Sequence, residues 1–276
     1  MLRSMSLELI WTDLPYARRA SAAATAGFDR VDLWNWRTSD VHEVAAACRD
    51  GGISINGFFG NRSFSLCDYE VRTSLLDEVK ESIDCAVEVG AHQLHIFSNA
   101  IRPGGIVVPS PDRSRAALHG ACLEGLVEMA DLVAGTGITL ALENLNPVFL
   151  PGYLWTSVSD TAIVARELAR DEVGVVFDAY HQQLSGGRLT QELLGAKDVL
   201  CRIDIAEVPG RYEPGAGEID FAYMRRLIDS MGWDGVLCFE TVPSDGNPQT
   251  ALYAIDDLFP LEWCHRPDPS KEREAI

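Results

Sequence analysis

The stretch Gly135-Thr136-Gly137-Ile138-Thr139-Leu140-Ala141-Leu142-Glu143-Asn144 decides the fold of this chain. Glycine ends a helix because it readily adopts the left-handed C′ conformation, and a short apolar run is typical of a strand buried on both faces. The same order of amphipathic helix, glycine and short apolar run returns along the chain. It accounts for the runs Arg30–Trp34, Ile53–Gly57, Gln93–Phe97 and Val236–Phe239. This repetition predicts strands that alternate with helices.

Three more apolar runs complete a set of eight predicted strands: Leu7–Ile10, Val173–Phe177 and Val199–Ile205. Amphipathic patterns predict helices between the strands, at Leu14–Ala26, Val41–Cys48, Tyr69–Val89, Asp112–Ala134, Val158–Leu168, Leu189–Leu194, Phe221–Ser230 and Pro248–Leu258. Alternating elements with short connections imply parallel strands with right-handed crossovers.

Eight such units fit the typical size of a TIM barrel. We therefore expect an α/β protein with a single (β/α)₈ barrel over residues 1–260 and a polar C-terminal tail over residues 261–276. A doubly wound sheet is the alternative architecture, but no GxGxxG motif follows the first predicted strand.

Composition restricts the classes of partner and location. The chain has 23 basic and 41 acidic residues, a net charge of −18, and no basic run, so we expect no nucleic-acid partner. No apolar stretch approaches the roughly 20 residues of a membrane span, and the N-terminus lacks a signal-peptide pattern. The seven scattered cysteines contain no CxxC pair. We expect a cytoplasmic protein without membrane contact.

Four carboxylates lie at the ends of the last four predicted strands: Glu143, Asp178, Asp204 and Glu240. They are 35, 26 and 36 positions apart, and each interval corresponds to about one βα unit. Barrel active sites are built at the carboxyl ends of the strands, so these side chains should meet at one edge. Their mutual repulsion calls for a cation, and oxygen ligands favour Mn²⁺, Mg²⁺ or Co²⁺. The spacing predicts a site for one divalent metal ion.

The sequence around these residues carries longer motifs: Leu142–Asn146 followed by Pro151-Gly152-Tyr153, Phe177–His181, and Ile205–Ile219 with its Pro-Gly-Arg segment. With Trp11–Pro15 and Ala26–Asp29, they resemble the hydroxypyruvate isomerase branch of the xylose isomerase-like TIM-barrel superfamily. That superfamily includes sugar phosphate isomerases and epimerases and AP endonuclease family 2. The resemblance covers residues 7–258 and is most specific in the second half.

The resemblance implies a barrel that uses one divalent metal ion, Mn²⁺, Mg²⁺ or Co²⁺, with Zn²⁺ as a further possibility. It implies Glu143, Asp178 and Glu240 as metal ligands, with Glu143 and Glu240 also acting as the acid/base pair. His181 and Arg211 would bind substrate oxygens. Asp204 departs from the branch, which usually has a neutral Gln or His as the fourth ligand. Many relatives assemble as dimers or tetramers, so a homo-dimer or homo-tetramer is expected.

Proton transfer next to a carbonyl explains why such a site needs both a metal and two carboxylates. Removal of the proton gives a cis-enediolate, and a metal chelated by the carbonyl and the adjacent hydroxyl stabilises its charge. Return of a proton to the neighbouring carbon isomerises the substrate, whereas return to the opposite face of the same carbon epimerises it. We therefore expect an isomerase or epimerase of a small ketose or keto-acid.

Other functions stay open from the sequence. A lyase or decarboxylase of a sugar-derived keto-acid could use the same enediolate chemistry. A non-catalytic sugar-binding protein would leave the paired Glu143 and Glu240 unexplained. A DNA-repair endonuclease of the superfamily would need many histidines and basic loops, whereas this chain has six histidines and a strongly negative charge.

For several other residues, the sequence is compatible with more than one role. The aromatic residues near the early strand ends could line a sugar site or pack in the core: Trp11, Trp34, Trp36, Phe58 and Phe59. His95 could support the site or pack in a strand. Glu213 and Glu218 belong to the long motif but receive no role from the sequence.

Overall fold

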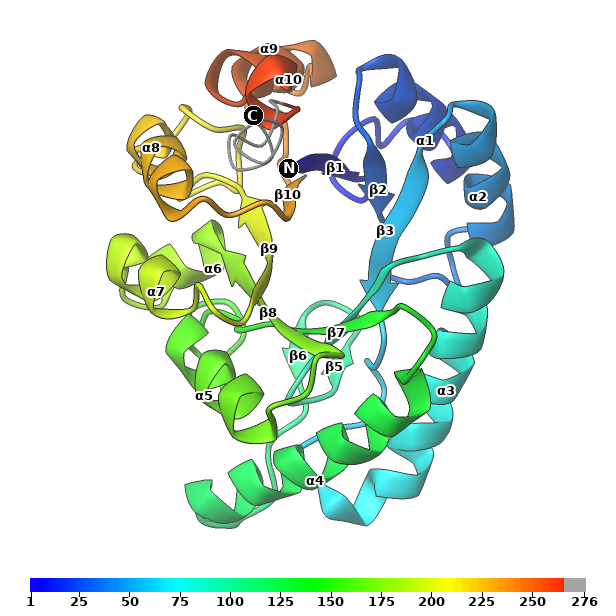
Figure 1. Ribbon diagram of the computed structural model, residues 1–276, viewed down its shortest axis with the longest axis vertical. Helices are drawn as coiled ribbons and strands as arrows, with labels where there is room; N and C mark the ends of the chain where they lie inside the picture. The colour runs from blue at the N-terminus through cyan, green and yellow to red at the C-terminus, as the bar shows by residue number, and fades with distance from the viewer. Residues whose placement is uncertain (266–276) are drawn as a thin grey trace, which may run out of the picture.

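The computed structural model describes residues 1–265 and contains a closed barrel of parallel strands in the order β1-β10-β9-β8-β7-β4-β3-β2 (Figure 1). The barrel strands are β1 Leu2–Ser6, β2 Arg30–Asp32, β3 Ser54–Phe59, β4 Gln93–Ile96, β7 Thr139–Leu142, β8 Val173–Asp178, β9 Leu200–Ile205 and β10 Val236–Phe239. A separate antiparallel hairpin pairs β5 (Ile101–Arg102) with β6 (Ile106–Val107). The predicted single (β/α)₈ barrel is confirmed.

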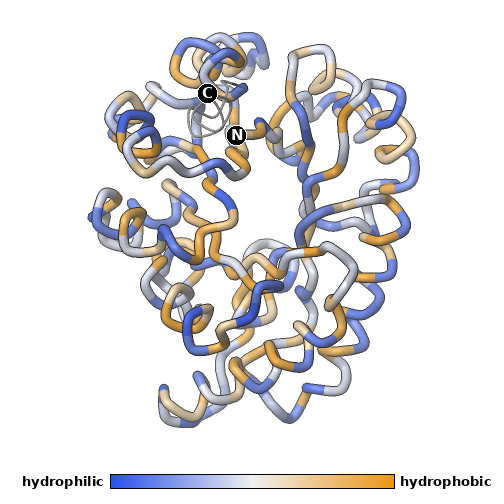
Figure 2. Tube along the Cα trace, viewed as in Figure 1, coloured by the Kyte–Doolittle hydropathy of each residue, from blue (hydrophilic) through white to orange (hydrophobic). Residues whose placement is uncertain are grey.

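Helices surround the ring of strands (Figure 1). They are α1 Tyr16–Thr25, α2 Val41–Asp50, α3 Arg72–Val89, α4 Arg115–Val133, α5 Val158–Leu168, α6 Ala179–Leu184, α7 Leu189–Gly195, α8 Phe221–Met231, α9 Pro248–Leu258 and α10 Leu261–Cys264, and the 3₁₀ helix η1 spans Tyr69–Val71. Hydrophobic and hydrophilic residues alternate along the outer helices (Figure 2) because one face of each packs against the barrel. In α8, for example, Phe221, Met224 and Ile228 are buried.

The opening strand was misplaced by the sequence prediction. We expected it at Leu7–Ile10, but β1 occupies Leu2–Ser6, and Leu7 only donates its N–H to Asp32 O, at 2.9 Å. Polar side chains made this strand hard to recognise. Arg3 is fully buried, with its guanidinium 4.7 Å from the Phe28 ring centroid and paired with Asp256 at 2.8 Å.

Three smaller elements were also not predicted: the β5–β6 hairpin, the short helix α6 after β8, and α10. Helix α10 begins where we expected the polar tail, and its Cys264 is buried. The rest of that expected tail, 266–276, lies outside the described residues. Within residues 1–265, no helix combines the length and hydropathy that a membrane span requires.

Candidate active site

The four predicted carboxylates meet at one end of the barrel. Asp178 and Asp204 are register partners across β8 and β9, Glu143 directly follows β7, and Glu240 directly follows β10. All four side chains are buried, with at most 6% of any residue exposed. We call Glu143, Asp178, Asp204 and Glu240 the carboxylate rim. The parallel strands bring these residues, which are far apart in the sequence, to the same end of the barrel because the carboxyl ends of the strands share one edge.

Two groups of possible metal ligands share Asp178. Ligand atoms of Asp178, Asp204 and Glu240 lie within 4.8 Å of one another, and so do those of Glu143, Asp178 and His181. Oδ2 of Asp178 and Oδ2 of Asp204 are buried, and neither accepts a hydrogen bond from any described residue. Buried carboxylate oxygens without donors are costly unless a cation binds them. The donor set therefore fits a hard divalent ion held mainly by oxygen.

Each of the two rim glutamates receives one N–H from the first half of the barrel. His95 Nδ1 donates to Glu143 Oε2 at 2.7 Å, and Trp34 Nε1 donates to Glu240 Oε1. Burial raises the pKa of Glu143, but the hydrogen bond and charge of His95 outweigh it, and the net pKa is lowered. Burial also raises the pKa of Glu240. The positive charge of Arg211 opposes this shift only in part, so the net pKa of Glu240 is raised. Without a bound ion, the two glutamates therefore differ in proton affinity.

Asp178 connects the end of β8 to helix α6. Its Oδ1 accepts the backbone N–H of His181 at 2.8 Å and so caps the helix. Burial raises the pKa of Asp178 to about 6, with Arg211 acting in the opposite direction. The cap fixes one oxygen and leaves Oδ2 directed towards the other rim carboxylates.

His181 is held in one orientation by Asn146. The Asn146 backbone N–H donates to His181 Nδ1 at 3.0 Å, and the Asn146 side-chain nitrogen lies 2.8 Å from the same atom. Burial, assisted by the positive charge of Arg211, lowers the pKa of His181 to about 4. The ring is therefore neutral near pH 7. Because Nδ1 accepts, Nε2 carries the proton and can donate it to a substrate oxygen.

Arg211 spans the rim. Its Nη2 lies 2.7 Å from Glu240 Oε2 and 3.6 Å from Asp178 Oδ2. The residue adopts a positive φ of 56°, an uncommon conformation for a residue other than glycine. Strained backbone of this kind often occurs at functional sites, where the surrounding structure supports it. Both predicted substrate-binding residues, His181 and Arg211, line the same cavity as the two glutamates.

A second set of charges lies beneath the rim, inside the barrel. Arg202 donates from Nε to Asp204 Oδ1 at 2.5 Å and from Nη1 to Asp32 Oδ1. Asp32 also accepts from Ser4 Oγ and from Asn56 Nδ2. We call Asp32, Arg202 and Asp204 Oδ1 the interior charge network. It offsets the extra negative charge that Asp204 brings to the rim.

Arg202 was not predicted as a site residue from the sequence, although a signal was present. Arg202 and Asp204 are two positions apart on β9, so both side chains point to the same face of the strand. A basic residue two positions before a buried carboxylate on one strand face is a natural partner for it. Asp32 carried no comparable signal, because it is 170 positions away from Arg202 in the chain.

The cavity above the rim has a volume of about 510 Å³ and an aromatic side. Trp34 stacks on Phe59 with ring centroids 6.1 Å apart, and Phe59 meets Phe97 edge to face at 4.8 Å. All three rings line the cavity, as does His95.

Trp36 does not line the cavity. Its Nε1 donates to Ser82 Oγ at 3.1 Å, and its ring packs against Phe58. Arg62 and the hairpin glycines Gly104 and Gly105 also line the cavity, although the sequence did not predict them there.

The acidic residues of the long motif shape the loop that carries Arg211. Glu213 accepts from the backbone and hydroxyl of Ser244, at 2.8 and 2.5 Å. Glu207 accepts from the backbone of Gly215 and Ile219, and a Cβ on Gly217 would lie only 2.6 Å from its carboxylate. Glu218 lies outside this arrangement and accepts from Gln183 at 3.0 Å. Glu213 thus fastens the loop to the segment after β10.

Comparisons with known proteins agree with this architecture. The family model described as xylose isomerase-like TIM barrel matches residues 20–258. The 2-oxo-tetronate isomerase of Pectobacterium atrosepticum is 28% identical over 241 residues, covering 86% of this chain and 90% of that protein. A Xenopus laevis protein provisionally named hydroxypyruvate isomerase is 24% identical over 255 residues, covering 87% of this chain and 90% of that protein.

Among solved structures, the AP endonuclease, family 2, from Brucella melitensis superposes with a TM-score of 0.83 and 24% identity. The match covers 93% of this chain and 99% of that chain, and it shows the fold alone. The match to the family model spans most of the chain. The protein therefore belongs to the xylose isomerase-like TIM barrel family, as the motifs around the strand-end carboxylates indicated.

Proposed function

We propose that this member of the xylose isomerase-like TIM barrel family is a divalent-metal-dependent isomerase or epimerase of a small ketose or keto-acid. The observation that carries the proposal is the pair of buried glutamates, Glu143 and Glu240. His95 and Trp34 each donate an N–H to one of them, and both glutamates line the cavity that also contains His181 and Arg211. The isomerase names of the relatives support the same class of reaction.

Glu143, Asp178, Asp204 and Glu240 would hold the metal ion. Asp204 is suited to this role because Oδ1 is occupied by Arg202 while Oδ2 has no hydrogen-bond donor among the described residues. When bound, a divalent cation neutralises negative charge that develops on the substrate's carbonyl oxygen. Mn²⁺, Mg²⁺ and Co²⁺ all suit this set of oxygens.

The chain's own residues then transfer the proton. Glu143, oriented by His95, accepts the proton from the carbon next to the carbonyl, and Glu240, oriented by Trp34, supplies one. His95 and Trp34 keep the two carboxylates oriented. His181 Nε2–H and the Arg211 guanidinium hold substrate oxygens between them, and the rings of the aromatic side exclude water. Delivery to the former carbonyl carbon, together with transfer of the hydroxyl proton to the former carbonyl oxygen, gives isomerisation, and delivery to the same carbon from the opposite face gives epimerisation.

The proposal is tested by metal analysis of the purified protein and by NMR of a panel of ketoses and 2-keto acids incubated with it in D₂O. We expect deuterium in an intact carbon skeleton, and activity that a chelator removes and Mn²⁺, Mg²⁺ or Co²⁺ restores. Loss of carbon or a dehydrated product would instead indicate a lyase.

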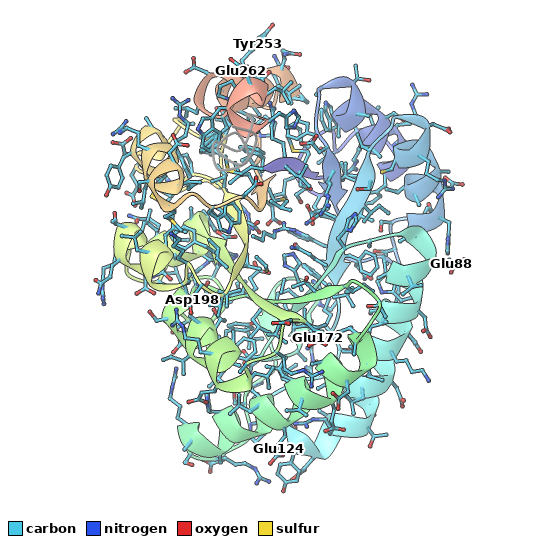
Figure 3. The ribbon with its side chains drawn as sticks, viewed as in Figure 1. Glu88, Glu124, Glu172, Asp198, Tyr253 and Glu262 are labelled. Atoms are coloured by element: carbon cyan, nitrogen blue, oxygen red, sulfur yellow. The ribbon has the colours of Figure 1, made fainter. Side chains whose placement is uncertain are left out.

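Two variants test the glutamates directly. Glu143→Gln and Glu240→Gln should each lower kcat by roughly 10²–10⁴-fold, the usual contribution of a general acid or base. Glu124→Gln is the matched control, because Glu124 lies on the outer helix layer in α4 (Figure 3). Full activity in both rim variants would refute the acid/base pair.

A further inference from the structure

Arg62 is a cavity residue that the proposed mechanism does not use. It follows β3 and lines the same cavity as Glu143 and Glu240. Its guanidinium lies 5.2 Å from the centroid of the Phe59 ring. It also forms a reciprocal pair of hydrogen bonds with Ile101 at the start of the hairpin, from Arg62 Nε to Ile101 O at 3.1 Å and from Ile101 N to Arg62 O at 2.9 Å. The side chain is therefore held in place on two sides.

The outer nitrogens of Arg62 remain unused. Within residues 1–265, Nε is the only side-chain nitrogen of Arg62 that donates a hydrogen bond, and Arg62 forms no ion pair. Glu8 exerts a favourable charge effect, but its own oxygens accept from Trp34 N at 2.9 Å and Tyr16 Oη at 2.6 Å. Arg211, the other arginine of the cavity, is paired with Glu240 and Asp178. Arg62 is thus a half-buried cation with a free pair of donors.

A guanidinium in this situation suits a carboxylate. Its two outer nitrogens match the two oxygens of a carboxylate in a bidentate pair, which is stronger than a neutral hydrogen bond. A partly desolvated cation such as Arg62 also gains more free energy from binding an anion than a fully solvated cation does. The carboxylate rim would repel an anionic substrate, so such a substrate needs a cation away from the rim. Arg62 supplies that charge from the first half of the barrel.

We infer that Arg62 binds the carboxylate of the substrate and so selects keto-acids over neutral ketoses of the same length. This inference rests on the proposed function, since it assigns the substrate class of the same cavity. Phe59 and the hairpin keep the guanidinium in one place, which reduces the entropy lost when the carboxylate binds.

The activity test compares Arg62→Met with the full-length wild-type enzyme loaded with Mn²⁺. Methionine keeps an unbranched apolar stem over Phe59 but removes the charge. The KM for 2-oxo-tetronate should rise roughly 10- to 100-fold, with a smaller change in kcat, whereas the kinetics with erythrulose should stay within about twofold. Arg62→Lys should lie between wild type and Arg62→Met, because it keeps the charge but loses the bidentate geometry.

Arg113→Met is the matched control, because the Arg113 guanidinium also lies over an aromatic ring, 4.2 Å from the Tyr69 centroid, but outside the cavity. It should leave both substrates unaffected. An equal loss with 2-oxo-tetronate and erythrulose in Arg62→Met would overturn the inference and indicate a structural role.

A binding measurement separates this inference from the proposed function. Erythronate carries the carboxylate but no carbonyl to isomerise, and erythritol lacks both. Calorimetry should show that wild type binds erythronate more tightly than erythritol and that Arg62→Met removes the difference. That result supports the role of Arg62 even if neither 2-oxo-tetronate nor erythrulose is turned over, which would count against the proposed function alone. An unchanged preference in Arg62→Met would overturn the inference whatever the turnover.

Discussion

Asp32 and Asp178 are both buried aspartates at the ends of barrel strands, and their surroundings differ in one respect. Asp32 belongs to the interior charge network, where Arg202, Ser4 and Asn56 donate to its oxygens. Asp178 belongs to the carboxylate rim, where Oδ2 has no hydrogen-bond donor among the described residues. Burial raises the pKa of each, but the partners of Asp32 reverse the shift, whereas Asp178 reaches about 6.

The contrast separates structural charges from functional ones. A buried charge whose partners are complete stabilises the fold only as long as every partner remains, because removal of one leaves the others unpaired. A buried charge with an open position costs stability and is retained where a ligand fills that position. Asp204 belongs to both regions, with Oδ1 in the interior charge network and Oδ2 on the rim.

Arg202→Met should be the most destabilising substitution in either region. It leaves Asp32 and Asp204 buried without their shared cation, so the free energy of unfolding should fall by about 3–5 kcal/mol. Urea denaturation followed by circular dichroism measures this change. Arg166→Met breaks an exposed pair with Asp198 and should cost less than about 1 kcal/mol. A comparable loss in the two variants would show that the interior charge network is not a structural unit.

Asp178→Asn should impair Mn²⁺ binding without lowering the stability of the metal-free protein, in contrast to Arg202→Met. Without divalent ions it should raise the free energy of unfolding near pH 7, because it removes a buried charge whose Oδ2 lacks a donor. With Mn²⁺ at 100 times its dissociation constant, wild type should gain about 2.7 kcal/mol and the variant little or nothing. Thermal unfolding with and without Mn²⁺ gives both values. Asp198→Asn, at an exposed position on the outside of the barrel (Figure 3), should retain the full gain.

The pH dependence of stability should also distinguish the two aspartates. The folded protein holds a proton on Asp178 up to about pH 6, whereas the unfolded chain loses it near the ordinary aspartate value. Stability in the absence of divalent ions should therefore fall as pH rises from about 4 through about 6, by at most about 1.4 kcal/mol per pH unit. The lowered pKa of Asp32 acts in the other direction and costs stability as pH falls. Subtracting the Asp178→Asn curve from the wild-type curve isolates the first effect, and a flat difference would contradict it.

Asp204→Asn should lower the free energy of unfolding much less than Arg202→Met does, because Arg202 keeps its pair with Asp32. We expect a loss of about 1 kcal/mol in the free energy of unfolding, with roughly tenfold weaker Mn²⁺ binding in calorimetry. Unchanged Mn²⁺ affinity would remove Asp204 from the proposed ligand set. A loss of stability as large as that of Arg202→Met would mean that the two regions are not separable at this residue.

Much of this arrangement was predictable because strand ends in a parallel barrel share one edge. The apolar runs before Glu143, Asp178 and Glu240 and their regular spacing were sufficient to place these residues together. The first strand was not predictable by the same rule. Its buried Arg3 and Ser4 look like surface residues in the sequence, and their partners, Asp256 and Asp32, come from distant elements.

The sequence by itself determined the barrel, its carboxylate rim and the family, because these depend on patterns within single βα units and on local motifs. Only the tertiary structure decided how the charges are compensated. Three features involve residues that are distant in the chain: the pairing of Arg202 with Asp32, the N–H groups that His95 and Trp34 donate to the two glutamates, and the hydrogen bond from Arg62 Nε to Ile101 O. Closure of the barrel brings these side chains together, and an electrostatic interaction depends on distance in space, whatever the separation in sequence.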